Sequence, residues 1–309
     1  MPAGTWLRSC PPSVLLSLAL LFTSVDARAH DTPETAGQSD LSSIRVVDAL
    51  NLFPNVGALI VFAEPNDFGI PLGILTSCSG TLIHERAFLV AGHCTAWTGG
   101  TLLPFIKLFV TLSPNARDPS AWREVSGLAY HPSIPPCPPP DFCTFLGLDP
   151  GILDVGLVFL RRPVRDVQPA TLARPGTLES NRAAGQLMIV AGYGFLNSLP
   201  DGSAPPISDW DGLRRLKISR LQRVADNEWA TWSLPGIVCF GDSGAPTFFN
   251  DHPFAGRASE RVVAVASDGS NVGEPCFTRD VRARVDTTEA QDWIRQTIAD
   301  AVGGRGRHD

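Results

Sequence analysis

Glycine and proline interrupt this sequence so often that most of it can form only short elements. The chain carries 28 glycines and 27 prolines among 309 residues, well above the roughly 12% of average usage. Proline lacks a backbone donor and glycine weakens helix and strand interiors, so such a chain favours short strands joined by many turns. The sequence therefore predicts an all-β protein rather than a helical bundle.

Short apolar or alternating runs between these interruptions are the expected strands. They cover residues 56–62, 79–83, 87–91, 105–112, 154–160, 186–191, 213–223 and 261–266. A helix is predicted over 287–301, because apolar residues recur there at helical spacing and Asp286 offers an acidic N-cap. Residues 135–142 are dense in proline and are expected to form a loop.

The first 29 residues have the pattern of a secretory signal peptide. Arg8 precedes a largely apolar run from Val14 to Phe22, and residues 27–29 (Ala-Arg-Ala) fit the small-x-small cleavage site. The run is shorter than the roughly 20 residues that span a bilayer. We therefore expect a secreted protein without a membrane span. Residues 30–45 are predicted to be a leader or propeptide, 46–302 the folded domain, and 303–309 a flexible tail.

The cysteines that remain after signal removal are even in number. Cys10 leaves with the signal, and those that stay are Cys78, Cys94, Cys137, Cys143, Cys239 and Cys276. In an exported chain this set favours three disulfides, although the spacing alone does not choose the pairing. A zinc site is disfavoured because no pair has the Cys-x-x-Cys spacing and the histidines do not cluster.

Residues 241–246 (Gly-Asp-Ser-Gly-Ala-Pro) place Ser243 between glycines. A serine hydroxyl needs a base to become a nucleophile, and it needs donors for the oxyanion that forms. Flanking glycines allow a sharp turn and let the backbone N–H groups approach a substrate. Standing alone, the stretch would be interpreted as a simple turn, because such turns are common.

A histidine base and an orienting acid are the other parts that a catalytic serine requires. Among the histidines, His93 has the most informative surroundings, since it follows an apolar strand and precedes Cys94. Asp154 heads the apolar run Asp-Val-Gly-Leu-Val-Phe-Leu, where a near-buried acid could hold its charge beside an imidazole. Each residue alone has a structural interpretation, as a surface histidine and as a solvated strand edge.

Taken together, the order and contexts of these residues resemble the chymotrypsin/trypsin family of serine endopeptidases. The resemblance covers about Val46 to Val302. The matching segments are 78–83 before the histidine, 90–94 (Val-Ala-Gly-His-Cys), 130–132 (Tyr-His-Pro), 154–157 (Asp-Val-Gly-Leu), 192–194 (Gly-Tyr-Gly), 239–246 around the serine, and 293–294 (Trp-Ile). The implied fold is two antiparallel six-stranded β-barrels with a C-terminal α-helix and the site between the barrels.

The resemblance also implies a role for each site residue. Ser243 is the expected nucleophile, His93 the general base and then acid, and Asp154 the residue that fixes the imidazole tautomer. The N–H groups of Gly241 and Ser243 are expected to form the oxyanion hole. The implied disulfides are Cys78–Cys94 and Cys239–Cys276, which leaves Cys137–Cys143. No metal or organic cofactor is implied.

The primary specificity pocket departs from the trypsin pattern. Its base falls at Ile237, which is followed by Val238, where trypsin-like members carry an aspartate. An unpaired Lys or Arg would lose its hydration there, so cleavage after apolar residues is predicted. Phe240, Ser267 and Gly269 are the other expected pocket residues, and Asp268 replaces the usual aromatic of the substrate-pairing strand.

Residues 45–49 (Arg-Val-Val-Asp-Ala) resemble the family's activation point. Cleavage after Arg45 would free the α-amino group of Val46, which would pair with Asp242 and order the oxyanion loop. Asp48-Ala49 departs from the usual Gly-Gly, and a plain strand start after a leader is the other interpretation.

Three alternatives stay beside the protease interpretation. A non-catalytic binding protein can keep this fold, although such proteins usually lose a triad member. An esterase can use the same machinery, and an α/β-hydrolase is disfavoured because the order Ser, Asp, His is reversed here and position 245 is alanine. Protein or peptide substrates and a monomeric state are expected, and the formal net charge of −6 argues against nucleic acid as a partner.

Overall fold

The computed structural model describes a large part of the unit formed by residues 39–309. The described residues are 45–65, 69, 72–96, 104–135, 151–180, 183, 185–200, 203–224, 229–233, 238–250, 260–269, 276 and 280–303. Several predictions concern residues outside these ranges, namely the signal peptide, the leader before Arg45, the tail after Gly303, the pair Cys137–Cys143 and the pocket residue Ile237.

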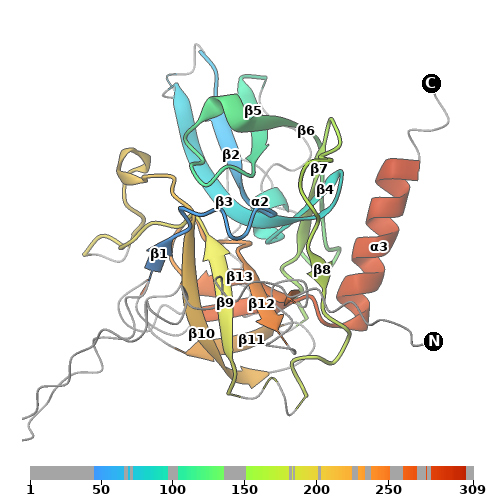
Figure 1. The fold of residues 1–309 in the computed structure, drawn as a ribbon. Coiled ribbons are helices and arrows are strands. Elements are labelled where there is room, and N and C mark those ends of the chain that lie inside the picture. The colour runs from blue at the N-terminus through green and yellow to red at the C-terminus, as the bar shows by residue number, and fades with distance from the viewer. Residues whose placement is uncertain are drawn as a thin grey trace, which may run out of the picture. The chain divides into compact units, whose positions relative to one another are not determined.

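The first half of the domain is a closed antiparallel barrel (Figure 1). Its strands are β2 (Val56–Ala63), β3 (Gly73–His84), β4 (Ala87–Val90), β5 (Ile106–Thr111), β6 (Trp122–Tyr130) and β7 (Gly156–Leu160), joined in the order β2-β3-β4-β7-β6-β5. Leu59, Val61, Leu82, Phe88 and Val110 fill its interior and are almost fully buried. Burial of this apolar surface is the main force that closes the barrel.

The second half closes in the same way. Its strands are β9 (Leu187–Gly192), β10 (Arg215–Val224), β11 (Trp229–Ser233), β12 (Pro246–Asn250), β13 (Glu260–Gly269) and β14 (Asp280–Arg284). Antiparallel pairings run β9-β10-β11-β14-β13-β12 and return from β12 to β9. Two short strands extend this sheet, since β1 (Arg45–Val47) pairs with β10 and β8 (Thr171–Leu172) pairs with β13. The predicted fold class, two six-stranded barrels with a C-terminal helix, is confirmed.

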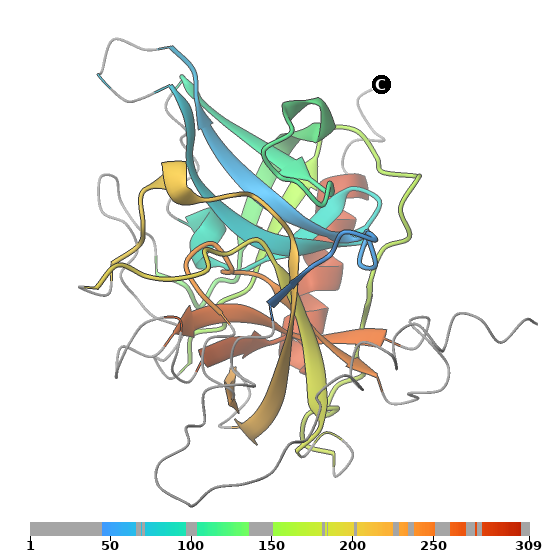
Figure 2. The ribbon, with the colours of Figure 1, turned by 60° about the vertical axis from the view of Figure 1, so that its left-hand side comes forward.

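The C-terminal helix α3 (Thr288–Gly303) packs where the barrels meet (Figure 2). Its buried residues Ala290 and Ile294 join an apolar cluster that contains Leu157 from the first barrel and Val262 from the second. The helix begins one residue later than predicted and extends through Gly303, which was expected to begin the tail. The described residues also form the short helix α2 (His93–Ala96) and the 3₁₀ turns η1 (Pro119–Ala121) and η2 (Ile207–Asp209).

The predicted N-cap of α3 was wrong by one residue. Thr287, rather than Asp286, caps the helix, because its Oγ1 accepts the N–H of Ala290 at 3.2 Å. The Asp286 carboxylate instead accepts the N–H of Leu178 at 2.7 Å and pairs with Arg284 at 3.0 Å. A long-range partner therefore outweighed the local capping position.

The strand predictions were incomplete in a way that has a physical cause. Each predicted run overlaps an observed strand, but β6, β8, β11, β12 and β14 were missed. β14 has the sequence Asp-Val-Arg-Ala-Arg, and its charged residues are buried rather than facing solvent. Its polarity therefore hid the strand from a search for apolar alternation. No helix within the described ranges is long and apolar enough to cross a membrane.

Candidate active site

His93 and Asp154 lie together at the end of the first barrel. His93 begins α2 directly after β4, and its ring Nδ1 lies 2.8 Å from Oδ2 of Asp154. The backbone N–H of His93 donates to the other carboxylate oxygen, Oδ1, at 2.7 Å. Two contacts from one residue fix both the position and the rotation of the imidazole. Asp154 is only 1% exposed, whereas the His93 side chain keeps 27% of its surface exposed.

The second barrel also contributes to this acid. Ser267 on β13 donates its hydroxyl to Oδ2 of Asp154 at 2.6 Å. Burial acts to raise the pKa of Asp154, but the nearby His93 and the hydrogen bonds from His93 and Ser267 outweigh it, so the pKa lies below its ordinary value. The carboxylate therefore stays ionised beside the ring. The sequence placed Ser267 only in the specificity pocket and missed this contact.

Two glycines allow the segments around His93 and Asp154 to approach closely. A Cβ at Gly92 would lie 2.9 Å from the carbonyl oxygen of Val155, and a Cβ at Gly156 would lie 2.6 Å from Oγ1 of Thr95. A larger residue at either position would push the two segments apart. Asp154 itself lies two residues before β7, so the prediction that it opens the strand was wrong by two residues.

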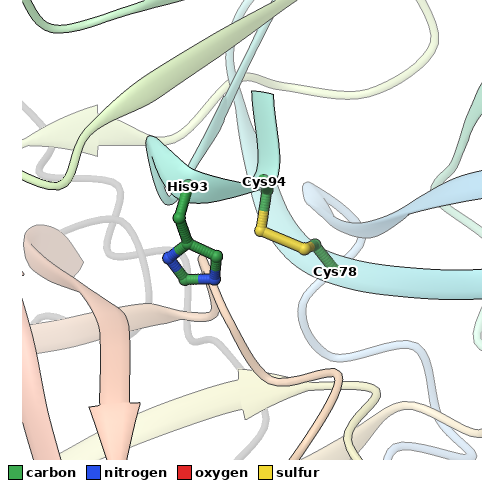
Figure 3. Close-up of side chains that lie close together, drawn as sticks. All are labelled: Cys78, His93 and Cys94. Atoms are coloured by element: carbon green, nitrogen blue, oxygen red, sulfur yellow. A yellow bond between two sulfur atoms is a disulfide. The ribbon is translucent and has the colours of Figure 1, made fainter. Parts of the chain in front are cut away.

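The disulfide Cys78–Cys94 holds α2 against β3 beside the imidazole (Figure 3). Within the described part of the chain, these two cysteines and His93 also form the one group of potential metal ligands that lie within 4.8 Å of one another. Their sulfur atoms are bonded to each other, so neither offers the thiolate that a metal needs. The second bridge, Cys239–Cys276, anchors the loop that carries Ser243. Both pairings implied by the family resemblance are confirmed.

The Ser243 loop belongs to the second barrel but is fastened to the first. Ser79 on β3 donates its N–H to the carbonyl oxygen of Ser243 at 2.8 Å, and the Sγ of Cys94 lies 3.8 Å from the same oxygen. Gly244 donates its N–H to Ala266 at 2.6 Å, which ties the loop to β13. Ser243 therefore lies against the residue that follows His93, and it is partly exposed.

Two backbone N–H groups of the loop, those of Gly241 and Ser243, have no acceptor among the described residues. Gly241 has a φ of +85°, a conformation that favours glycine. The carbonyl of Phe240 accepts the N–H of Phe195 at 2.8 Å. Because a trans peptide sets its N–H opposite its carbonyl, the Gly241 N–H points the other way. Neither this N–H nor that of Ser243 donates to any residue that the structure describes.

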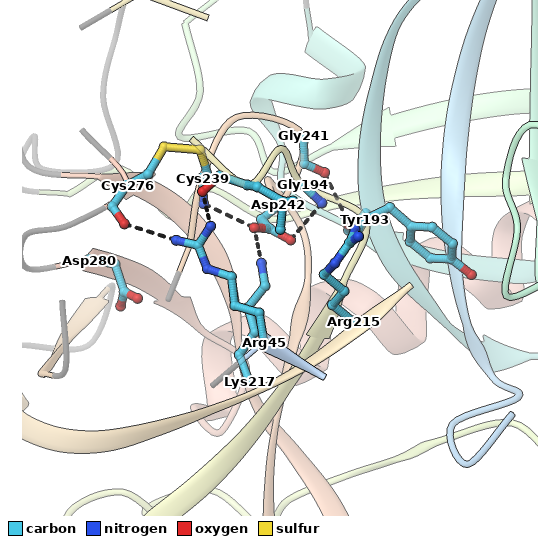
Figure 4. A network of polar contacts seen from close by, with 12 residues as sticks. Arg45, Tyr193, Gly194, Arg215, Lys217, Cys239, Gly241, Asp242, Cys276 and Asp280 are labelled. Carbon is cyan, nitrogen blue, oxygen red and sulfur yellow. Dashed lines mark hydrogen bonds and ion pairs between the residues drawn. A yellow bond between two sulfur atoms is a disulfide. The ribbon is translucent and has the colours of Figure 1, made fainter. Parts of the chain in front are cut away.

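Asp242 points into the second barrel and meets a lysine there (Figure 4). Its buried carboxylate forms an ion pair with Nζ of Lys217, which lies on β10 and is 2% exposed. It also accepts the N–H groups of Gly194 at 2.9 Å and of Cys239 at 3.0 Å. Sequence reasoning missed Lys217, although it is one of only two lysines in the chain and stands in an alternating strand.

The residues of the proposed activation point lie in β1. Val46 is 54% exposed and pairs with Leu216 on β10, while Arg45 is opposite Lys217. Arg45 donates its guanidinium to the carbonyl oxygens of Leu196 and Cys276, the latter at 3.1 Å. Burial lowers the pKa of Arg45, although Asp242 acts to raise it.

The expected pocket residues are placed as follows. Val238 is 8% exposed and packs with Val190, Ala245 and Ala266 beneath the Ser243 loop. Phe240 is 39% exposed at the rim of the same loop. Gly269 ends β13, two residues after Ser267. The pocket prediction that depends on Ile237 lies outside the described residues.

The chain is similar to known proteins in sequence and in fold. No protein-family model matches the chain. Phenoloxidase-activating factor 3 of Holotrichia diomphalia is 26% identical over 243 residues, which covers 72% of this chain and 64% of that protein. The inactive serine protease PAMR1 of Bos taurus is 30% identical over 162 residues, covering 48% of this chain and 19% of that protein. The chain therefore matches less than two thirds of the length of either relative.

A solved structure has the same fold. The structure of HL collagenase aligns with a TM-score of 0.56 at 18% identity, over 82% of this chain and 97% of that one. At this identity the likeness concerns the fold alone. Together, the sequence relatives and the paired barrels show that the chain has the chymotrypsin-like fold and is similar to proteins of the chymotrypsin/trypsin-like serine protease family.

Proposed function

We propose that this protein is a secreted serine endopeptidase that uses Ser243, His93 and Asp154 as a catalytic triad. The observation that carries the proposal is the double contact between His93 and Asp154, which the partner barrel reinforces through Ser267. A buried, ionised aspartate that fixes Nδ1 of a partly exposed imidazole leaves Nε2 to accept a proton.

The chemical steps follow from these positions. Ser243 Oγ attacks the carbonyl carbon of the scissile bond as its proton passes to Nε2 of His93. The imidazolium then gives this proton to the leaving amine, the C–N bond breaks, and an acyl-enzyme remains. Water attacks the ester in the same way, with His93 as base, and releases the acid and the free serine. Throughout, Asp154 stabilises the imidazolium without taking its proton.

The oxyanion of each tetrahedral intermediate would bind between the N–H groups of Gly241 and Ser243. These donors are supported by the positive φ of Gly241 and by the Phe195–Phe240 hydrogen bond, which turns the Gly241 N–H away from the barrel. Loss of one such donor costs roughly 10²–10³ in turnover. Preorganised donors of this kind usually supply the largest share of the rate enhancement.

The finer parts of the proposal concern substrate and location. An apolar residue before the scissile bond is favoured because Val238 and Phe240 offer no charge to a basic side chain. Secretion is supported by the signal-like first 29 residues and by the two disulfides. Protein or peptide substrates follow from the proposed chemistry, and we propose that the enzyme acts as a monomer.

The main alternative is a binding protein that keeps the fold without catalysis. It is favoured by one comparison, since the bovine relative is named an inactive serine protease. An esterase would use the same triad on a different acyl donor. A fluorophosphonate probe separates the catalytic readings from the binding protein, because it modifies an activated serine and ignores an inert one.

The test compares probe labelling of the wild type with Ser243→Ala, with the exposed Ser208→Ala as the matched control. We expect the wild type and Ser208→Ala to label equally and Ser243→Ala not to label. Equal labelling of all three refutes the nucleophile assignment. A folded wild type that never labels supports the binding protein. Among peptide substrates, a strong preference for Arg or Lys before the cut would contradict the apolar pocket.

A further inference from the structure

The carboxylate of Asp242 is fully enclosed by protein atoms. It is 0% exposed, and the backbone of Gly192 and Gly194 lies directly against its oxygen atoms, so that a Cβ at either glycine would collide with it. It accepts two backbone N–H groups and pairs with Lys217. A carboxylate this deeply buried is stable only when a cation and hydrogen bonds compensate for its lost hydration.

Lys217 forms its ion pair with Asp242 rather than with Asp280, the other buried carboxylate close to it. The charged groups that face it are Asp242, Asp280, Arg45 and Arg282. Asp280 is occupied by the guanidinium of Arg282, at 2.8 and 3.0 Å, whereas Asp242 pairs with Lys217. Lys217 and Asp242 thus neutralise each other in the uncut chain (Figure 4).

Backbone and side-chain hydrogen bonds hold the loop around Asp242 in one conformation. Asp242 donates its N–H to Cys239 at 2.9 Å and accepts that of Ala245 at 2.7 Å through its carbonyl. Ser79 Oγ donates to the carbonyl of Gly241 at 2.8 Å. These bonds fix the peptides on both sides of Asp242 while the Arg45–Val46 bond is intact.

The Arg45–Val46 bond lies in β1, which is paired with β10. Arg45, Val46 and Val47 are in register with β10 residues 215–217. Just beyond them, the buried Asp48 pairs with Arg214 at 2.9 Å and accepts the N–H groups of Leu52 and Phe53. To bring its α-amino group to Asp242, Val46 would have to leave this ladder and displace Lys217.

We propose that Lys217 supplies the internal cation that holds Asp242 and orders the oxyanion loop in the uncut chain, so that activity does not depend on cleavage after Arg45. The inference rests on the proposed function, because it concerns the regulation of the same site. In this proposal Lys217, rather than the α-amino group of Val46, provides the positive charge that pairs with Asp242.

The experiment uses the full chain with an enterokinase recognition sequence in place of residues 41–45. Cutting then frees the α-amino group of Val46 on demand. Four forms are compared, uncut and cut, each with Lys217 and with Lys217→Met, and intact mass establishes which form is present. The measured quantities are the rate of fluorophosphonate labelling at Ser243 and the rate of peptide hydrolysis.

With Lys217 present, the uncut form is expected to label within about threefold of the cut form, because its oxyanion donors are already in place. Uncut Lys217→Met is expected to lose roughly 10²–10³ in rate, the cost of a lost donor. Cutting Lys217→Met is expected to restore part of the activity, because the new amine offers Asp242 another cation. Recovery on cutting separates loss of loop order from loss of fold.

Two results would overturn the inference. One is an uncut chain with Lys217 that is inert until it is cut, and the other is an uncut Lys217→Met chain as active as its parent. The first comparison decides the matter even when Lys217→Met fails to fold. If all four forms are inert, the proposed function falls and the inference falls with it. Lys107→Met, which changes the other lysine, a half-exposed one, is the matched control and should leave every rate unchanged.

Discussion

The two barrels share one strand arrangement but fill their interiors differently. In β2 to β7, each buried side chain is apolar or carries a hydroxyl. In the second barrel, the described buried side chains include Arg215, Lys217, Asp280, Arg282 and Arg284. Apolar burial is non-directional, whereas an ion pair stabilises one arrangement of its partners. The comparison therefore assigns the geometry of the Ser243 loop chiefly to the second interior, whereas both interiors contribute to stability.

The candidate active site takes residues from both barrels. His93 follows β4 of the apolar barrel, whereas the Ser243 loop depends on Asp242 and the ionic interior. Asp154 is the residue that both barrels contact, through His93 and Ser267. Changes in either interior are thus expected to lower stability, but only changes in the ionic interior are expected to lower the reactivity of Ser243, and the following predictions use this difference.

The largest effect is expected where the barrels meet, at Asp154. Asp154→Asn should lower kcat by about 10⁴-fold, because the amide no longer fixes the productive imidazole tautomer. Peptide hydrolysis measures the change, with the exposed Asp166→Asn as a control that keeps full activity. A decrease in kcat of less than tenfold would contradict the proposed role of Asp154 in catalysis.

Lys217→Met is expected to have the next largest effect, on stability. It leaves Asp242 buried without a cation, which costs about 3–5 kcal/mol of unfolding free energy. Lys107→Met breaks a half-exposed pair with Glu64 at 3.6 Å and should cost at most about 1 kcal/mol. Urea unfolding of both variants measures the contrast. Equal losses of unfolding free energy in the two variants would show that the buried Lys217–Asp242 pair stabilises the fold no more than the half-exposed Lys107–Glu64 pair does.

Leu82→Ala tests the apolar interior. Leu82 is fully buried on β3, so its truncation should cost about 2–5 kcal/mol of unfolding free energy. The labelling rate of Ser243 per folded molecule should stay near that of the wild type, because the Ser243 loop keeps its ion pair. If Leu82→Ala molecules that circular dichroism shows to be folded lose labelling, the geometry of the Ser243 loop depends on the apolar interior as well, and the proposed difference between the barrels is wrong.

The smallest effect is expected on the alkaline side of the pH profile. Burial lowers the pKa of Lys217 below its ordinary value of 10.5, although Asp242 acts to raise it. As the pH rises through this lowered pKa, Lys217 loses its proton and Asp242 loses its cation. Labelling of Ser243 in the uncut chain should therefore decline at a lower pH than an exposed lysine would produce. A flat rate up to pH values well above 10.5 would contradict this dependence.

The sequence predicted those parts of the site that lie in contiguous motifs. The glycines around Ser243 and the cysteine beside His93 are local signals, and the apolar runs of the first barrel are recognisable by their periodicity. The contact of Ser267 with Asp154 joins residues 113 positions apart, and Lys217 meets Asp242 from a different strand. Such pairs arise only when the barrel closes, so the sequence carries no local pattern for them.

Ser79 makes the integrity of the fold and the reactivity of the serine inseparable. Its N–H holds the carbonyl of Ser243, its hydroxyl donates to Gly241, and the same oxygen accepts the N–H of Tyr193 at 2.9 Å. One fully buried side chain thus bridges β3 to two segments of the other barrel. Separation of the barrels would release the nucleophile loop before either core is exposed to water. Loss of labelling is therefore expected to be the first sign of unfolding, ahead of any change in secondary structure.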